Sequence, residues 1–180
     1  MKGNLIKILA VGGCAALLTT QALAETKDGY FGISYTSLNY EESGFPDANL
    51  SALNLRIGKQ YDEVISGELR FGFGVQDDEV SVFGYDAQLS VDTLLGVYLR
   101  ASVPVEGNFK PYAIVGFNRA ELEVNILGNN VSASEDDVAY GLGFDVEISN
   151  NLDLNVEYAN LYDKDGTELR GLNISLSARY

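Results

Sequence analysis

A strict alternation of apolar and polar side chains constrains this chain more than any other feature. Within Ser66–Gln76 (SGELRFGFGVQ) the apolar residues are Leu69, Phe71, Phe73 and Val75, and the residues between them include Glu68, Arg70, Gly72 and Gly74. Successive side chains of a β-strand point to opposite faces, whereas an amphipathic helix repeats its apolar residues every three or four positions. The segment is therefore predicted to be a strand with two unlike faces. Its GFG does not indicate a dinucleotide-binding loop, because that fingerprint is GxGxxG between a strand and a helix.

The first 24 residues have the features of a secretory leader. Lys2 and Lys7 accompany an apolar run that extends from residue 8 to residue 18. Ala22 and Ala24 then supply the small residues of a cleavage signal. We expect a signal peptide over residues 1–24 and one mature domain over residues 25–180. The alternative is a lipoprotein cleaved before Cys14, but the apolar run continues past that cysteine, where a lipoprotein would turn polar.

Cleavage would leave an acidic chain without thiols. The mature part has 180 − 24 = 156 residues, with no cysteine, histidine or tryptophan, so its stability does not come from disulfides. Two lysines leave with the leader, and the mature net charge is 10 − 26 = −16. This charge argues against nucleic acid as a partner, because nucleic acid binding needs a basic surface. No mature segment has 18 consecutive apolar residues, which argues against a transmembrane helix.

The alternation recurs in eight segments of the mature chain, which predicts an all-β fold. We expect strands at Tyr30–Tyr40, Ser51–Tyr61, Gly67–Val75, Ala87–Val103, Lys110–Val124, Val138–Ile148, Leu152–Leu161 and Glu168–Tyr180. In most of them one parity is apolar, and the other holds glycine, asparagine and charged residues.

The register of Lys110–Val124 is the least clear. Tyr112 and Ile114 compete for the apolar face with Ala113, Val115 and Phe117. We place the even residues on the apolar face, because this choice moves three charged residues to the polar one: Arg119, Glu121 and Glu123.

Alternation alone does not show which face is inside. A soluble sandwich or lipocalin-like barrel buries the apolar parity, whereas an outer-membrane barrel shows that parity to lipid. The connectors favour the membrane barrel. Three are short, at residues 62–66, 104–109 and 149–151, and they alternate with mostly longer acidic connectors at Glu41–Leu50, Gln76–Asp86, Asn125–Asp137 and Tyr162–Thr167. Short turns on one rim and longer loops on the other are typical of outer-membrane barrels, with both termini on the short-turn side.

Three further features favour the same fold. Segments of about 10 residues, tilted by about 40°, cross the apolar layer of an outer membrane. Glycines and charges of both signs share the polar parity, which suits the narrow interior of an eight-stranded barrel. Aromatic residues gather near the strand ends, as in interfacial girdles: Phe31, Tyr61, Tyr112 and Tyr180 on the short-turn side, and Tyr40, Tyr85, Tyr140 and Tyr162 toward the loops. We predict an eight-stranded antiparallel up-and-down transmembrane β-barrel.

Several segments carry a resemblance to a known family. They are GYFGISY near the start, PYAIVGF, YGLGFDVEI and the closing RGLNISLSARY. With these segments the chain resembles the small eight-stranded outer-membrane barrels of Gram-negative bacteria, the OmpA, OmpX and Opa-like superfamily, over essentially all of residues 25–180. The ending is similar to that family's insertion signal, carried by Gly171, Ile174, Leu176 and Tyr180, although the family more usually ends in Phe.

The resemblance implies a place in the cell outer membrane, with both termini in the periplasm. The partners it implies are outer-membrane lipid, lipopolysaccharide and the outer-membrane assembly machinery. Some small outer-membrane barrels are enzymes that use a histidine base, and this chain has no histidine, so we expect no enzymatic activity. The sequence indicates no cofactor.

The charges on the polar parity are the main candidate site. We expect a network inside the barrel, formed by Arg56, Glu68, Arg70, Asp92, Arg100, Asp145, Glu147, Asp153, Glu157 and Arg179. Such a network either gates a narrow water or ion path or packs as a self-neutralising core. The packed core is favoured, because eight strands leave an interior that side chains fill.

Three acidic motifs in the predicted loops were considered as metal sites. Asp163-Lys164-Asp165-Gly166 resembles the start of a calcium loop, but the other EF-hand ligands are missing, which favours a hairpin turn. Asp77-Asp78-Glu79 and Glu135-Asp136-Asp137 are candidates for divalent cations shared with lipopolysaccharide, and solvated loop charge is the simpler interpretation.

The leading functional hypothesis is a non-enzymatic, monomeric outer-membrane barrel with a role in envelope structure and surface-exposed acidic loops. The first alternative is an adhesin or host-factor-binding protein that acts through those loops. A narrow porin-like channel and a soluble periplasmic ligand-binding barrel are the others.

Overall fold

The computed structural model describes residues 28–44, 46–82, 85–126, 129–164 and 166–180. The expected leader, with Cys14, Ala22 and Ala24, lies outside them. The described strands are β1 (Gly29–Glu42), β2 (Ala48–Gln60), β3 (Ile65–Gln76), β4 (Asp78–Val82), β5 (Tyr85–Ser102), β6 (Phe109–Ile126), β7 (Asn129–Ser149), β8 (Leu152–Lys164) and β9 (Thr167–Arg179). The described residues contain no helix long and apolar enough to cross a membrane.

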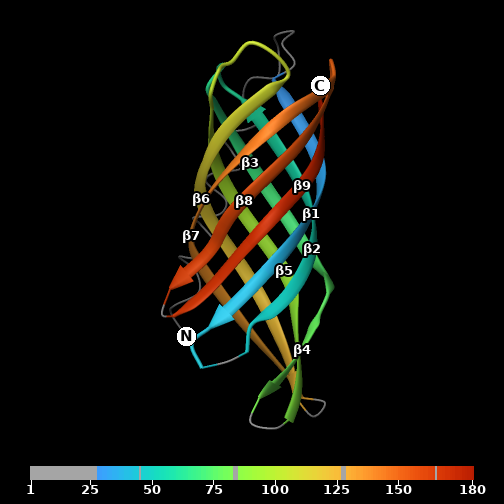
Figure 1. Cartoon of the computed structure of the whole chain (residues 1–180), viewed down its shortest axis with the longest axis vertical. Coiled ribbons are helices and arrows are strands. Elements are labelled where there is room, and N and C mark those ends of the chain that lie inside the picture. The colour runs from blue at the N-terminus through green and yellow to red at the C-terminus, as the bar shows by residue number, and fades with distance from the viewer. Residues whose placement is uncertain (1–27, 45, 83–84, 127–128, 165) are drawn as a thin grey trace, which may run out of the picture.

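The sheet closes on itself as an eight-stranded antiparallel barrel. Apart from β3 and β4, each strand pairs with its neighbour along the chain, β9 pairs with β1, and β3 pairs with β5. The short β4 lies beyond the end of β3 and extends that edge of β5. Figure 1 shows the long barrel with the C-terminus at its upper end and β4 at its lower end. We call the upper end, which carries the turns after β2, β5 and β7, the turn rim.

The predicted long loops are largely strand. β6 and β7 continue their pairing as far as Ile126 and Asn129, and β8 and β9 as far as Lys164 and Thr167. Alternation weakens in these segments because their side chains are polar on both faces. The strands predicted from alternation are therefore shorter than the observed ones. The acidic residues therefore lie on hairpins that lengthen the barrel at the loop end.

The turn-side part of the barrel has an apolar outer surface. Exposed side chains form this belt on all eight barrel strands, among them Phe31, Ile33, Leu55, Ile57, Phe71, Phe73, Leu95, Leu99, Val115, Phe117, Leu142, Tyr158, Ile174 and Leu176. Most residues between them point inward and are polar, tyrosine or glycine, as predicted for most strands, whereas Ile114 of β6 is a buried apolar exception. An apolar surface this extensive needs a lipid environment to cover it.

The loop-side part has the opposite polarity. We call it the collar. Its outward residues are polar or charged, including Ser37, Asn39, Glu41, Ser90, Asp92, Arg119, Glu121 and Arg170. Its interior, the loop-side core, is apolar: Leu38, Ala48, Leu50, Ala52, Leu89, Val91, Leu94, Ala120, Leu122, Ala139, Leu161 and Leu169 are buried. The collar is therefore built like a soluble barrel on top of a membrane barrel.

The change of polarity coincides with breaks in strand register. The pairing shifts at Val75 in β3, at Asp92 in β5 and at Leu161 in β8. An extra residue reverses the parity of a strand, so a segment can turn apolar side chains outward on one side of the bulge and inward on the other. In β5, Val91 is buried before the bulge and Leu94 is buried after it.

The predicted register of β6 is wrong. Tyr112, Ile114, Ala120 and Leu122 are buried, whereas Val115 and Phe117 are exposed. The even residues therefore face the interior, and Arg119, Glu121 and Glu123 lie on the outer face. The physical reason is that β6 runs from the apolar belt into the collar, so charged outward residues follow apolar outward ones on the same face.

The aromatic girdles are partly as predicted. Phe31, Tyr61 and Tyr180 are exposed at the turn rim, and Tyr140 is exposed at the other edge of the belt. The prediction is wrong for Tyr112 and Tyr162, which are buried. Tyr40 is partly buried, and the side chain of Tyr85 lies outside the described residues. Tyr35 and Tyr158 are exposed and complete the edge toward the collar.

The turn after β2 is held by a carboxylate. The backbone amides of Val64 and Ile65 both donate to Asp62 Oδ1 over 2.7 Å. These two bonds lower the pKa of Asp62 because they stabilise its charged form, and the bond from Ile65 has the larger effect. The side chain thus replaces backbone partners that a tight turn leaves unpaired.

Candidate functional site: the polar core of the barrel

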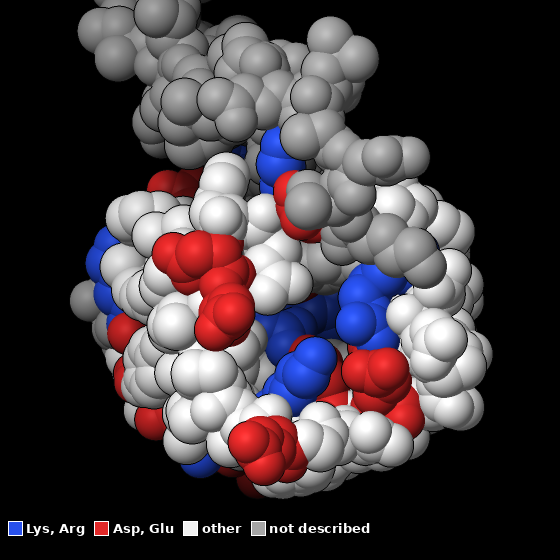
Figure 2. All heavy atoms as spheres, turned by 90° about the horizontal axis from the view of Figure 1, so that it is seen from above, with Lys and Arg blue, Asp and Glu red and all other residues white. Residues whose placement is uncertain are grey.

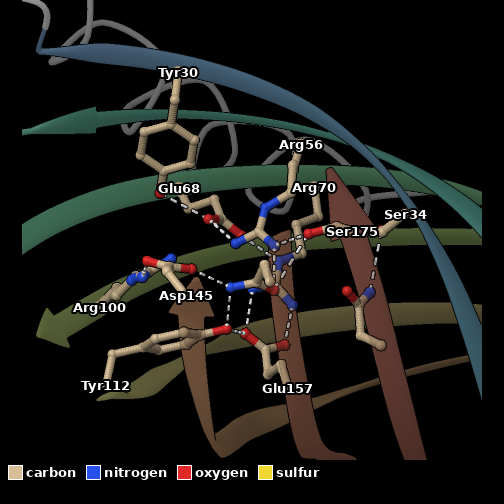
Figure 3. A network of polar contacts seen from close by, with 12 residues as sticks. Tyr30, Ser34, Arg56, Glu68, Arg70, Arg100, Tyr112, Asp145, Glu157 and Ser175 are labelled. Carbon is tan, nitrogen blue, oxygen red and sulfur yellow. Dashed lines mark hydrogen bonds and ion pairs between the residues drawn. The ribbon is translucent and has the colours of Figure 1, made fainter. Parts of the chain in front are cut away.

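Three arginines and three carboxylates meet inside the turn-side part of the barrel. Arg56, Arg70 and Arg100 come from β2, β3 and β5, and Glu68, Asp145 and Glu157 come from β3, β7 and β8. Figure 3 shows these side chains pointing toward one another from opposite walls. The formal charges cancel, so the interior carries no net charge that would need outside counterions. We call this group, with the tyrosines and amides that contact it, the polar core.

Arg70 connects the two sides of the barrel. Its Nη1 and Nη2 donate to the two carboxylate oxygens of Glu157 over 2.5 and 2.8 Å, which is a bidentate pair. Its Nε donates to Glu68 Oε1. Glu157 is only 1% exposed, so this pair is withdrawn from water. A fork of this kind fixes both side chains in one geometry.

Arg56 continues the network toward β8 and β9. Its Nη2 donates to Glu68 Oε2 over 2.5 Å, and its Nη1 donates to Asn155 Oδ1 and Ser175 Oγ, both over 2.8 Å. Glu68 also accepts a 2.7 Å bond from the hydroxyl of Tyr30. Glu68 therefore binds two arginines and a phenol, which satisfies a carboxylate that is almost fully buried.

Arg100 forms the turn-side layer of the polar core. Its Nη2 pairs with Asp145 Oδ2, and its guanidinium lies 3.5 Å from the centre of the Tyr112 ring. Asn155 Nδ2 donates to Asp145 Oδ1 over 2.6 Å and thereby joins this pair to Arg56. Tyr112 in turn donates to Glu157 over 3.0 Å. The Arg100–Asp145 pair is thus linked to the other charged groups of the core through the neutral side chains of Asn155 and Tyr112.

Glycines make room for the buried tyrosines. A Cβ on Gly143 would lie 2.5 Å from Cζ and Oη of Tyr112, and a Cβ on Gly96 would overlap the ring of Tyr98. Tyr98 also lies under Arg70, whose guanidinium carbon is 4.5 Å from the ring centre. The glycines on the polar parity therefore serve packing, as the narrow interior predicted.

A second group of charges surrounds the opening of the turn rim. Arg179 Nε lies 2.9 Å from Asp153 Oδ2, Arg179 Nη2 lies 3.1 Å from Glu147, and Lys110 lies 3.9 Å from Glu147. Lys110, Asp153 and Arg179, together with Arg100, line a vestibule of about 420 Å³. Figure 2 looks onto this rim and shows basic and acidic side chains around the hollow. Below it, next to Arg70 and Asn118, lies a cavity of about 20 Å³, which is large enough for about one water molecule.

The structure places nine of the ten predicted network residues in the interior or at its mouth. Arg56, Glu68, Arg70, Arg100, Asp145 and Glu157 form the polar core, and Glu147, Asp153 and Arg179 form the rim group. The prediction for Asp92 is wrong. It is exposed on the collar, where it accepts a 3.3 Å bond from Thr93, because the bulge reverses parity at this point.

The sequence interpretation missed the tyrosines and amides of the core. Tyr30, Tyr98, Tyr112 and Asn155 are all involved in it. The signal for Tyr98 was present, because it stands two residues before Arg100 on the same parity. Tyr112 was assigned to a girdle from its position near a strand end.

The closing strand lies as its pattern predicts. Ile174 and Leu176 face outward and Gly171 is buried, where a Cβ would lie 2.8 Å from Thr36 Cγ2. The backbone amide of Tyr180 donates to Gly29 over 2.9 Å, and its ring lies 6.1 Å from that of Phe31. The last residue thus joins β1 and closes the seam at the turn rim. Recognition of these residues by the assembly machinery stays a prediction.

The chemistry available to this site is ion pairing and packing. The core carboxylates are paired with arginines, the chain has no histidine, and its one cysteine is Cys14. Among the described residues, no three acidic, histidine or cysteine side chains are grouped as a metal site would need. The arrangement fits a structural core.

The comparisons agree with this fold. A family model described as the outer membrane protein beta-barrel domain matches residues 9–180. The chain belongs to this outer membrane protein beta-barrel family. Family membership indicates the outer membrane of a Gram-negative bacterium. A comparison with curated protein sequences finds no match.

Several solved structures resemble this member of the outer membrane protein beta-barrel family. Ail, the attachment invasion locus protein of Yersinia pestis, is 15% identical, with a TM-score of 0.65 over 85% of this chain and 98% of Ail. Neisserial surface protein A is 11% identical, with a TM-score of 0.65 over 84% and 97% of the two chains. OprG from Pseudomonas aeruginosa is 11% identical, with a TM-score of 0.61 over 85% and 96%. At these identities the likeness shows the fold alone.

Proposed function

We propose that this protein is a non-catalytic, non-conducting barrel that contributes to envelope structure and holds its acidic collar outside the cell. One observation carries the proposal: the loop-side core fills the collar interior. Leu38, Leu50 and Leu169 are each 1% exposed, and buried apolar residues from seven of the eight barrel strands, all except β3, complete the layer. Ions do not cross a packed apolar layer, because desolvating them costs too much.

The polar core supports the same function. It lies on the turn side of the apolar layer, and its three carboxylates are paired with its own three arginines, so it needs no counterions from outside. A membrane barrel with a packed interior acts as an anchor. Its contribution to the cell then depends on its outer surface and its collar.

The proposed orientation places the turn rim and both termini in the periplasm. Short turns on the periplasmic side and longer hairpins outside are the usual arrangement of this architecture. The belt would face outer-membrane lipid, and the collar would stand among lipopolysaccharide headgroups. We propose a monomer, because the closed sheet leaves no unpaired edge within the belt.

A surface ligand is the second candidate function, and the charge of the collar favours it. Thirteen of the 26 acidic residues, counted where the structure describes the side chain, belong to the collar: Glu41, Glu42, Asp47, Asp77, Asp78, Asp92, Glu121, Glu123, Glu135, Asp136, Asp137, Asp163 and Glu168. Among the described residues of the collar, only Arg119, Lys164 and Arg170 oppose them, giving 3 − 13 = −10. Ail has been solved with the heparin analogue sucrose octasulfate. The collar here would repel such a polyanion, so we propose a cationic partner.

Conductance measurements test the non-conducting barrel. Purified protein in planar bilayers should give no discrete current steps at neutral pH. The matched variant Leu50→Ser with Leu169→Ser makes the loop-side core polar, so any current through the interior should rise in this variant, whereas leakage around the barrel should not. Reproducible steps in the wild type that increase in the variant would establish the narrow channel instead.

A further inference from the structure

The longest hairpin has an open edge outside the belt. β7 pairs with β6 from Asn129 to Val146, but its pairing with β8 begins only at Tyr140. Within the part of the chain that the structure describes, no strand pairs with the other edge of β7 before Tyr140. Near the end of β8 the edge is partly covered, since Tyr162 donates to Glu135 and Asp163 N donates to Asp137. The fully open stretch is therefore Val131–Ser134.

The hydrogen-bonding groups of this edge can be assigned. Glu147 N donates to Asn108 O at the end of the β6–β7 pair, so the backbone of Glu147 faces β6. Backbone groups alternate sides along a strand, and the β6–β7 pairing has no register shift over its printed length. The odd residues of β7 therefore bond to β6, and Ser132, Ser134 and Asp136 direct their N–H and C=O groups to the open edge.

This edge lacks the devices that normally prevent strand addition. Natural edge strands are protected by proline, lysine, a bulge or an inward charge. Val131-Ser132-Ala133-Ser134 has none of these, and all four residues are exposed. A flat, small and uncharged edge of this kind is a template for another extended chain.

The charges next to the open edge determine which kind of chain can bind there. Glu135, Asp136 and Asp137 follow the open stretch directly, and Asp163 lies beside them. A second copy of this chain would bring the same charges and the same collar charge of −10 over the described residues, so self-pairing is unfavourable. The complementary partner is an extended segment with basic residues next to a stretch of small or β-branched ones.

We propose that the open edge of β7 at Val131–Asp136 binds an extended basic segment of another protein by strand addition. The inference deepens the ligand-binding role of the collar and rests on its proposed place outside the cell. Hydrogen bonds to the backbone of Ser132 and Ser134 would hold the bound segment as an added strand. The carboxylates of Glu135, Asp136 and Asp137 supply the charge preference.

Peptide binding to the protein in nanodiscs tests the inference. The probe is the labelled peptide KRTVTVT, compared with its acidic twin EDTVTVT and with a twin N-methylated at alternate residues. Anisotropy should show saturable binding of the basic peptide and at least about tenfold weaker binding of both twins. Amide hydrogen exchange should slow at Ser132 and Ser134 when the basic peptide is bound.

Two variants separate the backbone from the side chains. Ser134→Pro removes an edge donor without removing a bond to β6, and it should weaken binding at least about tenfold. Ser132→Ala with Ser134→Ala keeps the backbone and should bind within about twofold of the wild type. Heat-shifted migration on gels confirms that both variants are folded, and the exchange experiment on the wild type gives an independent reading if Ser134→Pro does not fold.

Three outcomes would overturn the inference. Equal binding by Ser134→Pro, or by the N-methylated peptide, would mean diffuse charge attraction. Unchanged amide exchange at Ser132 and Ser134 would place the peptide elsewhere. Self-association through this edge without peptide would replace the basic partner by a second copy. The peptide-binding measurements use protein in nanodiscs, whereas conductance is measured in planar bilayers. A negative peptide result would therefore overturn this inference without deciding whether the barrel conducts.

Discussion

Replacing Glu157 by Gln should destabilise the folded barrel by about 3–5 kcal/mol, because it removes one partner of a buried ion pair. Arg70 would keep Glu68 but lose its bidentate carboxylate, and the side chain of the replacement has nearly the same volume. The cost comes from the uncompensated guanidinium in a closed interior. Urea unfolding in lipid vesicles, followed by tyrosine fluorescence and gel mobility, measures the change.

Two further variants show whether the loss of stability comes from leaving a buried charge unpaired. Glu168→Gln removes a carboxylate 2.9 Å from Arg170 on the exposed collar, and should cost about 0–1 kcal/mol. Arg70→Met combined with Glu157→Gln removes both partners and leaves Arg56 with Glu68, so it should recover at least about 1 kcal/mol relative to Glu157→Gln alone. If Glu157→Gln were as mild as Glu168→Gln, the interior would be hydrated and the packed-core account would fail.

Replacing Leu142 by Arg should destabilise the barrel by about 2–4 kcal/mol, because this side chain faces lipid. Leu142 is 70% exposed on β7, opposite Ala113 of β6 and Tyr158 of β8. An exposed leucine on a soluble protein would accept arginine at almost no cost. The same unfolding measurement in vesicles gives the value.

Val131 is the matched control on the same strand. It is 65% exposed but belongs to the collar, so Val131→Arg should change stability by no more than about 0.5 kcal/mol. The two positions have similar exposure and opposite predicted outcomes. Equal effects at both would show that the belt and the collar do not differ in environment.

Most of the barrel could be predicted from alternation because most strands keep one parity through the belt. β1, β3 and β9 turn glycine, asparagine, serine and charge inward over their whole turn-side length. The charged core was also predictable, since Arg56, Glu68, Arg70 and Glu157 stand on that parity. Which arginine pairs with which carboxylate could not be predicted, because pairing across the interior depends on the closure of β3 onto β5 and of β9 onto β1.

The errors share one physical cause. A chain that is a membrane barrel in one half and a soluble barrel in the other reverses its polarity along each strand. In β6 both parities are then partly apolar, since Phe117 faces lipid and Leu122 faces the loop-side core. At Asp92 a single inserted residue changes parity where the polarity of the outer surface also reverses, so Val91 and Leu95 share one sequence parity although Val91 is buried and Leu95 is exposed.

The most direct test of this two-part barrel is the environment of two outward positions on β6. Phe117 lies in the belt and Glu121 lies in the collar, about 13 Å farther along the strand. Cys14 is the only cysteine of the sequence and lies in the expected leader, so Phe117→Cys and Glu121→Cys, each with Cys14→Ser if the leader is retained, can carry a single fluorophore in lipid vesicles. We predict that brominated lipid quenches the label at position 117 and that aqueous iodide quenches the label at position 121. Iodide quenching at both positions, without an effect of brominated lipid, would contradict the assignment of the belt to the membrane.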